Sequence, residues 1–115
     1  MIEKIILDYL IKNLPYPIFM EMPADEDKPS NGLFYLMEKT SSGQNDRLFS
    51  SVLAVQSNAP SMYEAAELNA IAKEVMLNAI ILPQVTRVRV NSDYNYTDTQ
   101  TKQYRYQAVF DIVHY

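Results

Sequence analysis

Residues 60–83 read PSMYEAAELNAIAKEVMLNAIILP, and this segment decides the fold class because it predicts a helix that needs a sheet to pack on. Ser61 and Glu64 have capping-box spacing, in which the serine hydroxyl accepts from the N–H of Glu64 and the glutamate carboxylate bonds back to the N–H of Ser61. Apolar side chains then recur at helical spacing, at Leu68, Ile71, Ala72, Val75, Met76 and Ala79. Pro83 ends the pattern because proline lacks an N–H and disfavours a helical residue before it. The pattern predicts one amphipathic helix whose apolar stripe needs a sheet to lie on.

The chain outside this helix predicts a second helix and about five strands. An apolar stripe that ends before Pro15 predicts the first helix, and its members are Ile2, Ile5, Ile6, Tyr9 and Leu10. Strand patterns cover residues 18–22, 33–40, 47–57, 85–96 and 102–115, with a charged loop at 24–32 and turns at 41–45 and 97–101. We therefore predict a single α+β domain over residues 1–115, with two helices on a mostly antiparallel sheet in the order α-β-β-β-α-β-β.

Alternation in the last two predicted strands separates a core face from an outer face. The side chains predicted to meet the core are Val88, Val90, Ala108, Phe110 and Ile112. Arg87, Arg89 and Arg105 are predicted to point the other way. This hairpin is also rich in tyrosine, and Tyr94 and Tyr96 are expected on the face of Val88 and Val90, beyond the end of the core.

The tyrosines of this hairpin are the candidate binding residues. Tyr94, Tyr96, Tyr104 and Tyr106 crowd its distal half. Tyrosine supplies a large contact area at a small cost in conformational entropy, so exposed clusters of it often mark protein interfaces. An alternative is that these rings pack on the first helix or cap the sheet. Aromatic rings beside arginines also permit stacking of single-stranded nucleic acid.

Composition excludes several classes of site. The chain has no cysteine, which excludes disulfides, thiolate nucleophiles and cysteine-ligated zinc, and favours a reducing cytoplasm. Two glycines, Gly32 and Gly43, are too few for a phosphate-binding glycine loop. The one histidine, His114, has no serine partner that sequence spacing suggests. We therefore predict no enzyme, no catalytic residue, no cofactor and no metal site.

The charge pattern bears on partners. A net charge of −4 argues against extensive nucleic-acid binding, and no apolar run is long enough to span a membrane. Residues 1–30 are rich in aspartate and glutamate, whereas residues 84–115 carry more arginine and lysine than acid. Opposite charges at two ends would suit head-to-tail self-assembly, and a solvated acidic loop is the alternative.

Three segments carry a family resemblance: residues 59–69 (APSMYEAAELN), 91–99 (NSDYNYTDT) and 104–111 (YRYQAVFD). They resemble the small tail-completion or tail-terminator proteins of long-tailed phages and prophages of Gram-positive bacteria, and the resemblance extends over essentially the whole chain. It implies a structural protein that forms a homo-oligomeric ring, commonly a hexamer, at the head-proximal end of the virion tail. Such a ring, assembled in the cytoplasm of the bacterial host, would end the tail tube and meet the head connector, with DNA passing through it as the only nucleic acid.

Individual interface residues are nominated on physical grounds alone: Arg87, Arg89, Tyr94, Tyr96, Tyr104 and Arg105. Two alternatives stay open. One is a head–tail adaptor or stopper of the same module. The other is a small-ligand or single-stranded nucleic-acid binding module that uses the tyrosine-rich hairpin.

Overall fold

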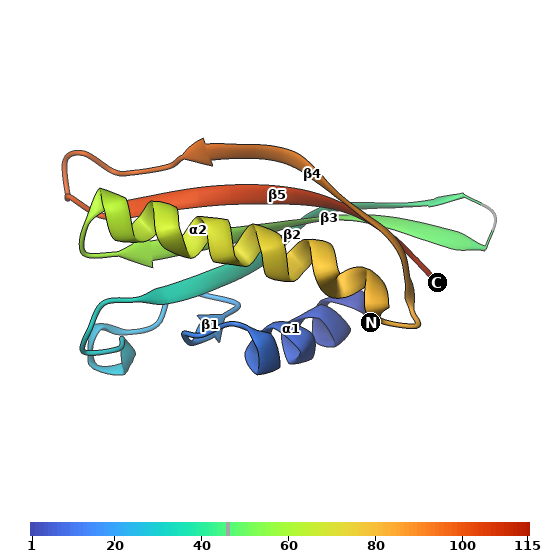
Figure 1. Ribbon diagram of the computed structural model, residues 1–115, viewed down its shortest axis with the longest axis horizontal. Coiled ribbons are helices and arrows are strands. Elements are labelled where there is room, and N and C mark those ends of the chain that lie inside the picture. The colour runs from blue at the N-terminus through green and yellow to red at the C-terminus, as the bar shows by residue number, and fades with distance from the viewer. Residues whose placement is uncertain (46) are drawn as a thin grey trace.

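A computed structural model describes residues 1–45 and 47–115, and in it two helices cover one face of a five-stranded sheet (Figure 1). The elements in chain order are α1 (Ile2–Asn13), β1 (Ile18–Phe19), η1 (Asp25–Asp27), β2 (Phe34–Asn45), β3 (Leu48–Ala59), α2 (Met62–Leu77), η2 (Asn78–Ile81), β4 (Val85–Asn95) and β5 (Tyr104–His114). The predicted α+β class and the order α-β-β-β-α-β-β are confirmed. The molecule is elongated, measuring 45 × 23 × 22 Å.

The sheet has the strand order β1-β2-β3-β5-β4. The pairs β2–β3, β3–β5 and β4–β5 are antiparallel, whereas β1 runs parallel to β2 and pairs only with Tyr35 and Leu36. The sheet is therefore mixed. The strand predicted at 18–22 is only two residues long, because the chain bends at Met20 and leaves the sheet.

Helix α2 begins at the predicted cap. The Ser61 hydroxyl accepts from the backbone N–H of Glu64 at 3.2 Å, but the Glu64 carboxylate accepts from that hydroxyl rather than from the predicted backbone N–H of Ser61. The buried side of the helix is formed by Ala65, Leu68, Asn69, Ala72 and Met76. Ile71 was predicted inside this stripe and is 36% exposed, because the stripe is rotated toward Ala65 and Asn69.

We expect Ser61→Ala to lower the free energy of unfolding by about 1 kcal/mol, because the N–H of Glu64 then loses its acceptor at the helix start. Urea denaturation followed by circular dichroism measures this. Ser30→Ala, in the exposed part of the charged loop, is the matched control and should leave the midpoint unchanged. Equal midpoints for Ser61→Ala and the wild type would show that the cap contributes nothing in solution.

One hydrophobic core lies between the helices and the sheet. Its fully buried members include Ile6 and Leu10 of α1, Met76 of α2, Met37 of β2, Leu53 and Val55 of β3, and Phe110 and Ile112 of β5. The hydroxyl of Tyr9 donates to the carbonyl of Val75 at 2.7 Å and ties α1 to α2. The core positions predicted at Ala108, Phe110 and Ile112 are confirmed. Val90 is 39% exposed, because β4 is an edge strand with a neighbour on one side only.

A β-bulge in β4 changes which face the tyrosines occupy. Val90 pairs with Phe110, but the register then shifts between Val90 and Ser92, so that Tyr94 pairs with Gln107. A shift of one residue sends every later side chain to the other face of a sheet. The prediction that Tyr94 and Tyr96 share a face with Val88 and Val90 is therefore wrong. They lie on the face that carries no helix.

The β2–β3 hairpin is longer than predicted. The turn expected at residues 41–45 is absent, because β2 continues through this segment to Asn45 and pairs with Leu48 to Val52 of β3. A bulge lies between Lys39 and Ser41, just before the Ser-Ser-Gly segment, which is itself paired in regular register. The paired ends of these strands form an arm that extends beyond α2 (Figure 1). We call residues 41–45 and 47–50 the β2–β3 arm.

Candidate assembly surface

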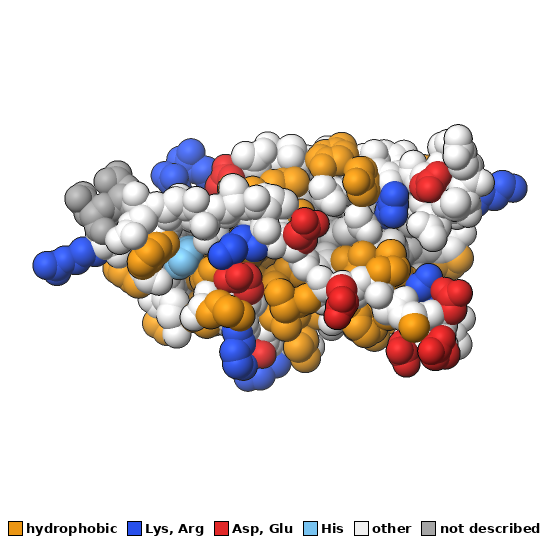
Figure 2. Space-filling view, turned by 180° about the vertical axis from the view of Figure 1, so that it is seen from behind, with side chains coloured by type: hydrophobic (Ala, Val, Ile, Leu, Met, Phe, Trp, Pro, Cys, Tyr) orange, Lys and Arg blue, Asp and Glu red, His pale blue; other side chains and the backbone are white. Residues whose placement is uncertain are grey.

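Both helices pack on one side of the sheet, and the other side, which we call the open face, carries no helix, although Phe34, Ala54 and Asn58 on it are buried. Strand register places on this open face the side chains of Glu38, Val52, Gln56, Arg105, Gln107, Val109, Asp111 and Val113. Figure 2 shows this side of the molecule, where hydrophobic, basic and acidic side chains are interspersed and the acidic ones gather toward one corner. Overall apolar content does not distinguish protein interfaces from the rest of a protein surface, so the case for this face depends on its individual side chains.

Two tyrosines and an arginine form an ordered cluster on the open face. The rings of Tyr94 and Tyr96 meet edge to face, with centroids 6.0 Å apart, and the residues are 41% and 45% exposed. The Arg105 guanidinium lies 4.7 Å from the centroid of the Tyr96 ring, and its Nε donates to the Tyr96 carbonyl at 2.7 Å. Gln107 donates to the hydroxyl of Tyr94 at 2.6 Å. These contacts fix the rings before any partner arrives, which lowers the entropy cost of binding. We call Tyr94, Tyr96 and Arg105 the tyrosine cluster.

The other nominated residues do not join this cluster. Arg87 and Arg89 lie on the same face and strand, opposite Val113 and Asp111, nearer the base of the hairpin. Tyr104 pairs with Ala59, so it lies on the helix side of the sheet. Tyr106 shares that side and is half-buried. The predicted group of four tyrosines is thus divided between the two faces, two on each.

A polar contact to α2 holds β4 in the register that exposes the tyrosine cluster. Asp93 follows the bulge and points toward α2, where Asn69 Nδ2 donates to its Oδ1 at 2.6 Å and Lys73 Nζ binds its Oδ2. Burial raises the pKa of Asp93, but the hydrogen bonds from Lys73 and Asn69 and the charge of Lys73 outweigh it, so the pKa lies below its usual value. Sequence reasoning missed this contact, because an asparagine inside an apolar helical stripe gives no sign of its partner.

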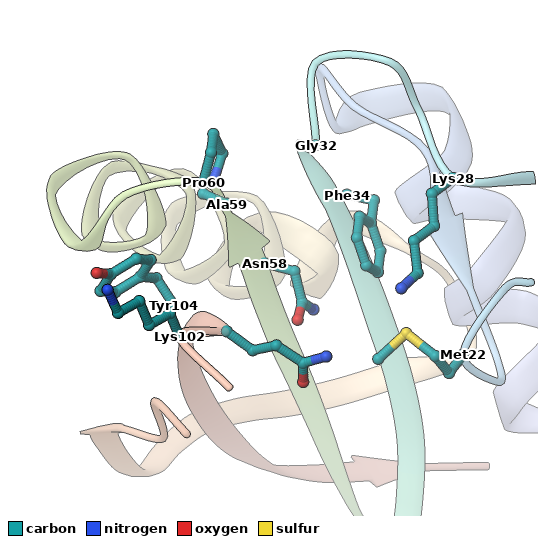
Figure 3. A pocket seen from close by; sticks show the side chains of 10 residues that line it. Met22, Lys28, Gly32, Phe34, Asn58, Ala59, Pro60, Lys102 and Tyr104 are labelled. Atoms are coloured by element: carbon teal, nitrogen blue, oxygen red, sulfur yellow. The ribbon is translucent and has the colours of Figure 1, made fainter. Parts of the chain in front are cut away.

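Tyr104 lines a cleft between the charged loop and the β4–β5 turn (Figure 3). The cleft has a volume of about 190 Å³, and the side chains of Met22, Lys28 and Asn58 point into it, whereas Lys102 lies beside Tyr104. The Lys28 ammonium is 3.1 Å from Asp25. This lining offers two ammonium groups, of Lys28 and Lys102, and the amides of Asn58 and Gln103, which can hold a polar group of a partner.

The lone histidine has a serine partner that the sequence did not reveal. Ser51 Oγ lies 2.8 Å from His114 Nε2, because β3 pairs with β5 here, and the Phe49 ring stacks on the imidazole with centroids 5.7 Å apart. The other ring nitrogen, Nδ1, lies 3.1 Å from the main-chain oxygen of Tyr115. Ser51 and His114 are both buried, so the pair satisfies two polar groups at the base of the β2–β3 arm.

Sequence reasoning also missed an exposed apolar patch where α2 runs into η2. Leu77, the last residue of α2, is exposed there, as are Ile80 and Ile81 of η2. The apolar run at residues 79–82 could have indicated this patch. Helical periodicity alone does not show which of these side chains remain exposed.

Comparison with protein-family models and with curated proteins finds no match to this chain. The resemblance to tail terminators therefore stays a prediction. Within residues 1–45 and 47–115, no group of three or more histidine, aspartate or glutamate side chains is placed to hold a metal ion. In the same part of the chain, no helix combines the length and the apolar character needed to cross a membrane.

Proposed function

We propose that this chain is a non-enzymatic structural protein of a phage or prophage virion, a tail terminator that forms a homo-oligomeric ring. The ring would end the tail tube and join it to the head connector. The observation that carries the proposal is the tyrosine cluster, which is ordered by its own contacts, exposed, and set on a sheet face that no helix covers. The likeness of residues 59–69, 91–99 and 104–111 to tail terminators supports the same reading.

The open face suits assembly because its two long sides differ. Strand β4 bounds it on one side with Arg87 and Arg89, and β2 bounds it on the other with Glu38. Unlike sides favour a heterologous contact between copies, and such a contact closes into a ring when its rotation allows. A head–tail adaptor or stopper would use the same surface, so the choice between these roles depends on which virion protein the ring contacts.

Light scattering over a concentration series tests this proposal. We expect the mean mass to rise with concentration toward a fixed multiple of 13.3 kDa, the mass of one chain. Mixing with a tail-tube protein should then give a complex that elutes ahead of either component. A species that stays monomeric at every concentration and binds no tail-tube protein would contradict the proposal.

A second candidate function rests on the same cluster. Tyr94 and Tyr96 lie on an open sheet face with Arg87, Arg89 and Arg105, an arrangement that can stack bases of single-stranded nucleic acid. The net charge of −4 opposes it. Tyrosine fluorescence during titration with an oligonucleotide separates the two functions. Quenching at low salt that weakens as salt is added would favour nucleic acid, and an unchanged signal would remove this candidate.

A further inference from the structure

We propose that copies of this chain join by strand addition, with the β4 edge of one copy pairing antiparallel with the β2 edge of the next and Ser92 lying opposite Ser41. In this arrangement the tyrosine cluster packs against the next copy beside Met20 and Met22. The inference rests on the proposed self-assembly. It adds which two strand edges pair, in which register, and which part of the next copy contacts the tyrosine cluster.

Strand β4 and part of β2 each have one side along which no other strand of the described residues lies. Strand β4 pairs only with β5, and β1 pairs with β2 only at Tyr35 and Leu36. Within residues 1–45 and 47–115, no strand lies along β2 from Glu38 to Gly43 on the side away from β3. Unpaired N–H and C=O groups along a strand are a template for another strand.

Strand direction fits a head-to-tail contact. Each of the pairs β2–β3, β3–β5 and β5–β4 is antiparallel, so β2 and β4 run in opposite directions. When a second copy is set beside the first with the same face forward, its β2 therefore lies antiparallel to β4. The added pair continues the alternation of the sheet, and both open faces stay on the same side.

Two bulges and the charges select the register. The bulges lie between Val90 and Ser92 in β4 and between Lys39 and Ser41 in β2. Placing Ser92 opposite Ser41 sets the two bulges directly on either side of this pair, one in each strand. This register brings Asp93 opposite Lys39 on the helix side, where both side chains are about one-third exposed, at 29% and 32%.

The same register places the tyrosine cluster over a cleft of the next copy. A cleft of about 190 Å³ on the open face is lined by Met20, Met22, Leu36 and Glu38, among others. Met20 and Met22 are 49% and 43% exposed. Tyr94 would lie opposite Glu38, at the point where β1 takes over the β2 edge, so the two rings reach this cleft. Methionine side chains adapt their shape and make favourable contacts with aromatic rings.

Pairing of β4 with β4 of a second copy is the competing arrangement. It would bring Arg87 and Arg89 of two copies together on one face, and like charges placed across neighbouring strands are destabilising. The β2 edge offers Glu38, Ser41 and Gly43 on that face instead. Charge therefore favours the unlike pair of edges.

Cysteine cross-linking tests the proposal cleanly because the natural chain contains no cysteine. Ser92→Cys and Ser41→Cys are prepared separately, mixed, and treated with a short bis-maleimide. We expect a cross-linked dimer in the mixture and only background in either variant alone. The double variant Ser41→Cys/Ser92→Cys should give a ladder of covalent multimers. Circular dichroism of each variant confirms that it is folded.

Ser42→Cys is the matched control, because Ser42 neighbours Ser41 but lies on the helix side of the sheet. Mixed with Ser92→Cys, it should cross-link no more than the single variants do. Equal cross-linking of Ser41→Cys and Ser42→Cys, or dimers of Ser92→Cys alone, would overturn the proposal. Multimers in light scattering without the Ser41–Ser92 product would also overturn it, while leaving self-assembly intact. A chain that never self-associates would overturn both.

Discussion

Replacing Tyr94 and Tyr96 together by alanine is expected to weaken self-association about 100-fold while leaving thermal unfolding unchanged. Aromatic residues at the centre of an interface each contribute about 2 kcal/mol or more when truncated, and a tenfold change corresponds to about 1.4 kcal/mol, so a combined loss of about 3 kcal/mol is a cautious expectation. Neither residue belongs to the core, so the fold should survive the change. Sedimentation velocity over a concentration series measures the shift in the association midpoint.

Tyr63→Ala is the matched control for this double variant. Tyr63 is more exposed than either cluster tyrosine, at 75%, but it stands on α2 on the other side of the sheet. Its removal should leave the association midpoint in place. If Tyr63→Ala weakens association as much as the double variant, the helix side carries the interface and the assignment to the open face is wrong.

The order of the elements could be predicted because each helix carries its own local signal. The capping residues and the apolar stripe of α2 lie within one short segment, and the stripe of α1 ends before Pro15. Local periodicity of this kind needs no knowledge of distant residues. The strands were also placed, but their ends were not, since pairing partners far along the chain set where a strand stops.

The two main errors have this non-local origin. Residues 41–45 have turn-forming composition, yet they stay extended because β3 pairs with them along the whole arm. The face of Tyr94 and Tyr96 was wrong because the bulge after Val90 is not visible in an alternating pattern. Sequence composition found the tyrosine cluster, and only the pairing of β4 with β5 could show which side of the sheet it occupies.

The long-range polar contacts could not be predicted at all. Asn69 meets Asp93 across 24 positions of the chain, and Ser51 meets His114 across 63. Neither pair has a spacing that a motif records. Each depends on the stacking of α2 over β4 or on the register of β3 with β5.

Asp93→Ala should lower the free energy of unfolding at neutral pH by roughly 2–3 kcal/mol, because it leaves the buried Asn69 amide and the Lys73 ammonium without their acceptor. Guanidinium denaturation measures the loss. Asp8→Ala is the control, since Asp8 forms an exposed pair with Lys4 within α1, and such pairs contribute about 0.5 kcal/mol or less. Similar losses for the two variants would mean that the Asp93 contact is no stronger than a surface pair.

The effect of Asp93→Ala should depend on pH. The pKa of Asp93 is lower in the folded chain than its ordinary value of 3.8, because the bonds from Lys73 and Asn69 and the Lys73 charge outweigh the effect of burial. An aspartate whose pKa is lowered by folding stabilises the fold at pH values above its pKa in the unfolded chain. This stabilisation is lost as the pH falls through its pKa in the folded chain. The difference in stability between wild type and variant should therefore be full at pH 6 and shrink below about pH 4. A constant difference from pH 6 to pH 2 would contradict this origin.

The same substitution connects stability to assembly. Asp93 is the first residue after the bulge to face α2, so its bonds to Asn69 and Lys73 hold the register in which Tyr94 and Tyr96 face outward. Without them, the distal part of β4 should open more often, and amide hydrogen exchange should rise at Tyr94 and Tyr96 more than at Val88. Self-association should weaken in parallel, although Asp93 lies on the other side of the sheet from the rings. Faster exchange with unchanged association would show that the rings keep their places without the Asp93 contact.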